Sequence, residues 1–307
     1  MFSYLNRQYG CDIISMIRSS VRLQPDREME EEPMAGKDFG AFKHTIERRF
    51  MQHPAVTRNE YTGWFSRGEM SLDQVRHFTV QFSVFSNQFL LAALNRVINA
   101  DSLQSARESK EILMNELGVI YNAGGKSDGH SGATGDEVDP ALVSTSGTVN
   151  GGKFRFEAAH FEWLLRFGQP LGLTFDDLGK RRHGTPSTLR FCDELFRLYG
   201  SDDYNEAMGA AFAVENWAAA GFWKELIAGL EKVKSREVPD LPLAFFTWHD
   251  KIEDQHKAHV WDELNACYHA DAFREEPFVS AGVKMLDAVK VFWDGLRDNR
   301  HPETRVA

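Results

Sequence analysis

The sequence predicts an all-α protein, and three observations support this fold class. Apolar residues recur at helical spacing through most of the chain, alternating strand-like patterns are scarce, and 42% of the 307 residues are hydrophobic, which is ample for a buried core. The 45 acidic and 35 basic residues give a net charge of −10, and no run rich in Lys and Arg would follow a phosphate backbone. We therefore expect a globular helical protein that does not bind nucleic acid.

The N-terminal segment differs from the rest of the chain. It ends in the run PDREMEEEPMAG, whose charges and prolines oppose ordering by burial. We expect a flexible N-terminal arm over 1–36 and a single helical domain over 37–307. The first helical stripe of this domain comprises Phe39, Phe42, Ile46 and Phe50. A second helix is expected over 71–100, where Ser71 and Gln74 form a capping-box start.

Helical patterns continue along the rest of the chain. The further helices are expected at about 102–120, 154–171, 186–199, 202–233, 243–270 and 277–298. Thr185 and Pro186 supply a start signal, and Gly200 supplies a stop. Between them, residues 121–153 are rich in Gly, Ser, Thr and Asp and interrupt the helical pattern, so we expect a long loop there.

The cysteine content and the apolar runs bear on location. Cys11, Cys192 and Cys267 are too few and too scattered for a disulfide framework, which fits a reducing compartment. No stretch approaches the roughly 20 apolar residues that cross a bilayer, and the start of the chain is not organised like a signal peptide. We expect a cytoplasmic protein without a membrane partner.

The strongest local motif is WHDKIEDQH, in which His249, Glu253 and His256 stand at positions i, i+4 and i+7 of a predicted helix. This spacing places all three side chains on one helical face. The rest of that face is apolar, which predicts that these polar groups point inward. The alternative is a solvated face that happens to carry two histidines.

Three other polar residues interrupt apolar stripes of other predicted helices: Glu116, His160 and Glu215. A buried carboxylate without a partner is costly or becomes protonated, so it needs a metal, a cation or a strong donor. Each residue alone has a simpler explanation: a buried Glu bonded to Arg or Tyr, or a core His with a hydrogen-bond partner. Together with the WHDKIEDQH motif, they place Glu or His on four predicted helices, and this coincidence favours a joint site.

Three carboxylates and three imidazoles from facing helices can bind two first-row metal ions in a bundle core. Cys-rich or all-His sets are more typical of zinc or copper. A mixed oxygen and nitrogen set suits non-haem iron or manganese and indicates dioxygen chemistry.

The order of these residues resembles the haem-oxygenase-like diiron oxidases, which carry a Glu, a His, a second Glu and then His-x3-Asp/Glu-x2-His on a late core helix. The resemblance spans roughly residues 40–298. The metal ligands that it implies are Glu116, His160, Glu215, His249, Glu253 and His256. It also implies a seven-helix haem-oxygenase-like (TenA/PqqC-like) up-and-down bundle that binds two Fe(II)/Fe(III) ions. The same resemblance implies O2 as co-substrate, a peroxo-diferric species and an external reductant.

One departure from the family pattern bears on the reaction. In several members the first Glu and the first His lie about two helical turns apart, whereas residues 121–153 separate Glu116 from His160 here. This interruption resembles the N-oxygenase-like branch, in which an additional carboxylate can join the site. Glu157, one turn before His160, is the candidate for that ligand. Other residues that could take part are Glu137 and Asp139 as the extra ligand and His130 in place of His160.

The resemblance implies N-oxygenation of an amine of a small amino-acid-derived metabolite in a biosynthetic pathway, in a dry pocket. The residues expected to line it are Phe82, Phe85, Phe212 and Phe222. The main alternative is oxidative C–C fragmentation of an amino acid or fatty acid at the same site. Others are a thiaminase-like hydrolase using Cys192 or Cys267, a haem protein using His44, and a scaffold with a structural metal. A homodimer is the default expectation, and a redox partner would supply electrons.

Overall fold

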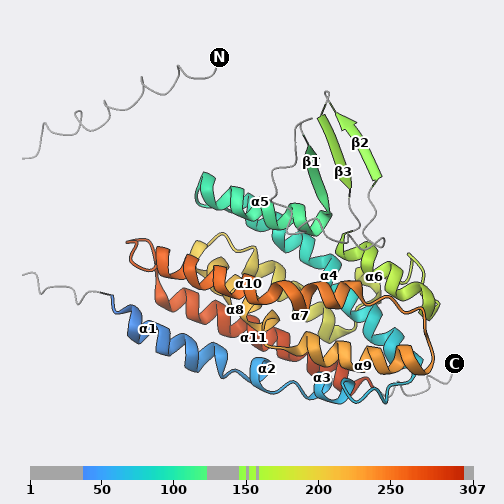
Figure 1. Ribbon diagram of the computed structural model, residues 1–307. Coiled ribbons are helices and arrows are strands. Elements are labelled where there is room, and N and C mark those ends of the chain that lie inside the picture. The colour runs from blue at the N-terminus through green and yellow to red at the C-terminus, as the bar shows by residue number, and fades with distance from the viewer. Residues whose placement is uncertain (1–36, 123–144, 150–151, 157–158, 301–307) are drawn as a thin grey trace, which may run out of the picture. The chain divides into compact units, whose positions relative to one another are not determined.

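Helices α8 (Tyr204–Ala218) and α11 (Glu275–Asp298) pack along each other at the centre of the computed structural model of the chain (Figure 1). Small residues in α8 allow this close contact, because a Cβ atom added at Gly209 would lie 2.0 Å from the Phe278 carbonyl oxygen. Helix α7 (Pro186–Tyr199) packs against both helices, and α4 (Leu72–Ile98) packs against α7. The core is therefore helical, as the sequence predicted.

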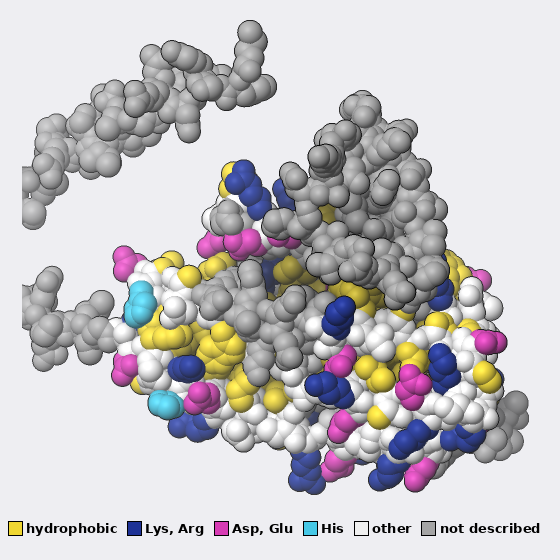
Figure 2. Space-filling view, viewed as in Figure 1, with side chains coloured by type: hydrophobic (Ala, Val, Ile, Leu, Met, Phe, Trp, Pro, Cys, Tyr) yellow, Lys and Arg dark blue, Asp and Glu magenta, His cyan; other side chains and the backbone are white. Residues whose placement is uncertain are grey.

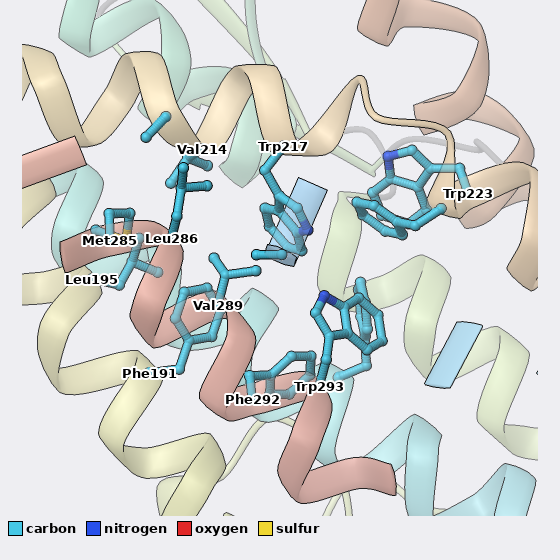
Figure 3. Packing of buried hydrophobic residues seen from close by; sticks show 14 of the residues in the cluster. Phe191, Leu195, Val214, Trp217, Trp223, Met285, Leu286, Val289, Phe292 and Trp293 are labelled. Carbon is cyan, nitrogen blue, oxygen red and sulfur yellow. The ribbon is translucent and has the colours of Figure 1, made fainter. Parts of the chain in front are cut away.

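Large apolar side chains fill the space between these helices. Figure 3 shows Phe191 and Leu195 of α7 facing Phe292 and other residues of α11. Phe191 and Phe292 are fully buried, and their ring centroids lie 5.5 Å apart. Burial of such rings removes a large apolar area from water, which is the main force that holds helices together.

Several helix ends lie where the sequence predicted them. At the start of α4, the Ser71 hydroxyl accepts from the Gln74 amide at 3.3 Å, and the Gln74 side chain accepts from the Ser71 amide at 2.9 Å. Pro186 is the first residue of α7, and this helix ends immediately before Gly200. The structure therefore confirms these start and stop signals. The sequence could predict them because each acts through groups next to it in the chain.

The predicted single helix over 202–233 is wrong. The chain forms α8 and then α9 (Phe222–Arg236), with a break at Ala219–Gly221. Gly221 has φ +90°, a conformation that glycine adopts readily and that other residues rarely adopt. The apolar pattern continues through the break, which is why it resembles one helix.

The predicted long loop contains strands. Strands β1 (Val119–Asn122), β2 (Thr145–Val149) and β3 (Gly152–Phe156) form an antiparallel sheet in the order β1-β3-β2. The predicted helix over 154–171 therefore begins only with α6 (His160–Gly168). The run Lys153-Phe154-Arg155-Phe156 alternates charged and aromatic residues, a pattern typical of a strand.

The remaining elements complete the chain. They are α1 (Phe39–Ile46), the π-helical turn η1 (Glu47–Met51), α2 (Pro54–Thr57), α3 (Glu60–Phe65), α5 (Leu103–Leu117), the 3₁₀ turns η3 (Gln169–Leu171) and η4 (Arg181–His183), and α10 (Ala244–Cys267). The first predicted stripe corresponds to α1 and η1, where Phe42, Ile46 and Phe50 are buried. The described residues from Asp38 onward belong to one compact unit.

The structure describes residues 37–122, 145–149, 152–156 and 159–300. Within these ranges it does not describe the side chains of 104, 120–122, 145–149, 152–156, 252–260 and 262–263. The predicted N-terminal arm lies outside the described residues. Among the helices in the described ranges, none is long and apolar enough to cross a membrane.

Candidate metal centre

The structure brings together three of the six predicted ligands. Glu116 lies at the end of α5, His160 is the first residue of α6, and His249 lies in α10. The His160 Nδ1 atom is 2.7 Å from Glu116 Oε2, and the His160 and His249 ring centroids are 4.6 Å apart. Residues that are far apart in the sequence therefore meet at one place.

The sheet explains how Glu116 reaches His160 across 44 residues. Helix α5 ends at Gly118, which has φ +64°, and β1 begins at the next residue. In the β1–β3 pair, Val119 lies opposite Phe156. This pairing holds the end of α5 and the start of α6 close together, so Glu116 and His160 become neighbours.

The Glu116–His160 pair is largely shielded from water. The side chain of His160 is 10% exposed and that of Glu116 is 14% exposed. His160 Nδ1 donates to the Glu116 carboxylate, which matches the hydrogen-bonded core histidine that the sequence left open as an alternative. A hydrogen bond to a charged acceptor in such a place is short and strong, so it fixes the orientation of the imidazole ring.

His249 is held by its own helix and by aromatic rings. Its Nδ1 atom lies 2.6 Å from the carbonyl oxygen of Phe245, one turn earlier in α10, to which it donates. The imidazole stacks on Trp223, with ring centroids 4.6 Å apart and an interplanar angle of 23°. His249 is half-buried and is thus restrained on one face by Trp223 and at one nitrogen by Phe245.

These contacts select the same tautomer in both histidines. With the proton on Nδ1, the lone pair of a neutral imidazole lies on Nε2, the atom that would bind a metal. Metal-binding histidines commonly donate their other ring N–H to a carboxylate or a backbone carbonyl. Carboxylate and imidazole are donor types that non-haem iron accepts.

Of the other three predicted ligands, the structure describes the side chain of Glu215 alone. Glu215 lies in α8 and is half-buried, whereas its position in an apolar stripe predicts a buried side chain. Its neighbour Asn216 is 2% exposed, accepts from Trp261 Nε1 and donates to the Phe212 carbonyl. Successive side chains of a helix point in different directions, and in α8 the neutral amide of Asn216 lies deeper in the core than the carboxylate of Glu215.

Glu253 and His256 lie in α10, but their side chains are outside the described residues. The other candidates outside the described residues are Glu157, His130, Glu137 and Asp139. Among the side chains that the structure does describe, no three His, Cys, Asp or Glu residues form a group that could hold a metal ion. The six-ligand diiron set therefore stays a prediction.

Sequence reasoning missed the aromatic surroundings of the histidines. Around His160, the Trp163 and Trp248 rings lie 5.5 and 5.2 Å away between centroids, and Phe245 lies 4.3 Å from His249. The sequence contains seven tryptophans, but periodicity assigns them only to helix faces and not to a common site. The expected lining residues Phe82, Phe212 and Phe222 are buried in the same continuous core.

The structure also bears on two alternatives. Burial raises the pKa of the Cys192 thiol to about 12, which opposes its use as a nucleophile. The His44 side chain is 83% exposed on α1 and contacts Glu47, which does not suit an axial haem ligand. Cys267 is half-buried, lies 3.3 Å from the Met208 sulfur and donates to the Leu264 carbonyl at 3.4 Å.

Comparisons with known proteins place the chain by fold. No protein-family model and no curated protein matches the sequence. Among solved structures, a TenA homolog from Pseudomonas syringae pv. tomato str. DC3000 matches with a TM-score of 0.58 and 12% identity. The match covers 84% of this chain and 93% of that chain.

A CADD-like protein of unknown function from Nostoc punctiforme PCC 73102 matches in two structures, both with a TM-score of 0.54. The identities are 18% and 17%, and the matches cover 85% and 88% of this chain and 97% and 98% of the other. These likenesses confirm the predicted fold class, an all-α bundle like that of TenA.

Proposed function

We propose that this protein is a non-haem diiron oxygenase that uses O2 to oxygenate an amine nitrogen of a small, amino-acid-derived metabolite. The proposed ligands are Glu116, His160, Glu215, His249, Glu253 and His256, with Glu157 as an additional carboxylate. Two electrons per turnover would come from an external reductant. Amine oxygenation, rather than C–C fragmentation, rests on the sequence resemblance and on the long segment between Glu116 and His160.

The observation that carries the proposal is the meeting of Glu116, His160 and His249 from three helices. Sequence order alone left His160 in competition with His130, because His160 lies 44 positions after Glu116. The 2.7 Å contact between the two side chains supports His160 as the partner of Glu116. Helix α10 adds Glu253 and His256 at one and two turns beyond His249, on the same helical face.

The iron ions would supply open coordination positions and the electrons that activate O2. The chain itself would position and protect the site. Glu116 orients His160 through its hydrogen bond, and the Phe245 carbonyl orients His249. The rings of Trp163, Trp223 and Phe245 surround the imidazoles, which keeps bulk water from one side of the site.

Iron binding and oxygen reactivity test the proposal together. The purified protein is titrated anaerobically with Fe(II), its metal content is measured, and it is then mixed with O2 in a stopped-flow spectrometer. We expect about two iron ions per chain, as in other bundle-core diiron sites, and a transient visible absorption band. His249→Ala and Glu215→Ala should abolish this band, because each removes one ligand.

His44→Ala is the matched control, because it removes an imidazole that is 83% exposed on α1. It should leave both the iron content and the band unchanged. The ligand assignment fails if His249→Ala and Glu215→Ala keep the band, and the diiron site fails if the native protein holds one zinc ion per chain. With candidate amines, product mass then separates the two reactions, since N-oxygenation adds oxygen and fragmentation removes carbon.

A further inference from the structure

A continuous series of aromatic rings runs from His249 through the core to α3. His249 stacks on Trp223 at 4.6 Å, Trp223 contacts Phe222 at 4.5 Å, and Phe222 contacts Trp293 at 5.5 Å, all between ring centroids. The series comes from α10, α9 and α11. Figure 3 shows Trp223 and Trp293, together with Trp217 of α8, facing one region of the core.

The series continues from Trp293 toward solvent. Trp293 stacks on Tyr61 at 5.8 Å with an interplanar angle of 28°, and Tyr61 contacts Trp64 at 5.5 Å. Trp223, Trp293 and Tyr61 are at most 5% exposed, whereas Trp64 is half-buried. The inner end thus contacts a proposed metal ligand, and the outer end reaches the surface.

The indole N–H groups of Trp223 and Trp293 are buried and have no hydrogen-bond partner within the part of the chain that the structure describes. The same holds for Trp217. A buried donor without an acceptor is destabilising, and phenylalanine would fill most of the same volume without that cost. Indole differs from a phenyl ring in losing an electron much more easily, which gives a reason for tryptophan at these positions.

The unpartnered N–H groups also affect the oxidised state. A tryptophan cation radical that can pass its proton to an acceptor becomes a less oxidising neutral radical and stops there. Trp223 and Trp293 lack such an acceptor among the described groups, which favours oxidised forms that keep the proton and pass the charge onward. Trp64 lies under the Arg300 guanidinium, 4.8 Å from the ring centroid, and this cation favours loss of the indole proton to water.

We propose that Trp223, Trp293 and Trp64, with the rings of Phe222 and Tyr61 between them, form an electron-transfer chain from the surface to His249. This inference rests on the proposed function. Indole is hard to oxidise, so the chain conducts only toward the strong oxidant that O2 generates at the iron site when no substrate consumes it. It would protect the site by discharging unused oxidising equivalents.

The electron balance is simple. Trp223 gives one electron to the oxidised site. Trp293 then reduces the oxidised Trp223 through the Phe222 ring, and Trp64 reduces the oxidised Trp293 through the Tyr61 ring. Oxidised Trp64 releases its indole proton to water. A soluble one-electron donor of the ascorbate class then reduces Trp64, and without such a donor O2 converts it to hydroxylated or ring-opened products.

Mapping of oxidised residues tests the chain. The full-length protein is loaded anaerobically with Fe(II), its iron content is measured, and it receives O2 without substrate or reductant. Peptide mass spectrometry then measures oxygen addition at each tryptophan. We expect several-fold more oxidation at Trp64 than at Trp261, which is also half-buried and lies in the helix that carries His249. Added ascorbate should suppress the oxidation of Trp64.

Variants locate the path. Trp293→Phe should abolish the excess at Trp64 and move oxidation inward to Trp223 and His249, and Tyr61→Leu should do the same by removing the bridging ring. Tyr61→Phe keeps that ring and should keep the native pattern. Trp261→Phe is the control, because it removes a half-buried indole that lies outside the series and is hydrogen-bonded to Asn216. Circular dichroism and iron content establish that each variant is folded and loaded.

Two results overturn the proposal and are distinguishable. If the protein binds iron and O2 oxidises it, but Trp64 is oxidised no more than Trp261 and Trp293→Phe changes nothing, the chain is wrong and the proposed function stands. If the native protein takes up no iron, the proposed function and the chain fail together, because nothing generates an oxidant beside Trp223.

Discussion

Helices α11 and α5 are opposite cases of how a helix is held in this protein. In α11, Phe278, Met285, Val289 and Phe292 are fully buried. In α5 none of the described apolar side chains is buried, and Leu103, Met114 and Leu117 are 66%, 37% and 43% exposed. Packing thus determines the position of α11, whereas α5 gains little from burial.

This difference matters because α5 supplies Glu116. The imidazole of His249 is fixed by Trp223 and by the Phe245 carbonyl, inside a packed aromatic region. The carboxylate of Glu116 depends more on its hydrogen bond to His160 and on the β1–β3 pairing than on the packing of its helix. We therefore expect the core to govern stability and the Glu116 side of the site to govern metal affinity.

The largest effect should come from removing a ring from α11. Phe292→Ala leaves a cavity among Phe85, Phe191 and Trp293, whose ring centroids lie 5.0–5.8 Å from that of Phe292. We expect the free energy of unfolding to fall by about 3–5 kcal/mol, measured by urea denaturation. Phe292→Leu fills most of the cavity and should lose much less. Equal losses for the two variants would show that the site is not packed as described.

The second effect concerns metal binding rather than folding. Glu116→Gln keeps the size of the side chain but removes the charge that holds His160 and that would bind iron. We expect the affinity for Fe(II) to fall by about 10- to 100-fold, measured by anaerobic titration. Glu111→Gln, an exposed position on the same helix, is the control and should leave the affinity unchanged. Unchanged affinity in Glu116→Gln would remove Glu116 from the site.

The sequence predicted those parts of the fold that local chemistry controls. The capping box at Ser71 and the stop at Gly200 were correct because each involves neighbouring groups. The break at Gly221 and the strand β3 were missed. An apolar stripe on both sides of a glycine does not reveal a change of direction, and a strand of five residues is recognised only by the partners with which it pairs.

The candidate site could be predicted in part for a similar reason. Helical spacing groups His249 with Glu253 and His256, but it contains no information about which other helix faces them. The contact of Glu116 with His160 depends on β1 pairing with β3, a long-range event that no local pattern specifies. The stacking of Trp223 on His249 depends in the same way on how α9 lies against α10.

A third effect depends on pH. It tests the burial of a histidine through the cost of protonating it, instead of through the cost of a cavity. Burial lowers the pKa of His77 in α4, and its Nε2 atom has no hydrogen-bond partner within the described ranges. Below the unfolded-state pKa of about 6.5, the unfolded chain binds a proton that the folded chain resists, so stability falls as the pH is lowered through this range. His77→Gln should flatten this slope in urea titrations between about pH 7 and pH 5. His44→Gln, at an exposed position, should keep the native slope.

The smallest effect should come from α5. Leu117→Ala shortens an apolar side chain that is 43% exposed and next to Glu116 in sequence. We expect the free energy of unfolding to change by no more than about 0.5 kcal/mol, because exposed positions lose little when they are truncated. Iron affinity should also stay unchanged, because the hydrogen bond from His160 to Glu116 does not involve the neighbouring side chain. A loss comparable to that of Phe292→Ala would mean that α5 is covered in solution, and the contrast between the two helices would then disappear.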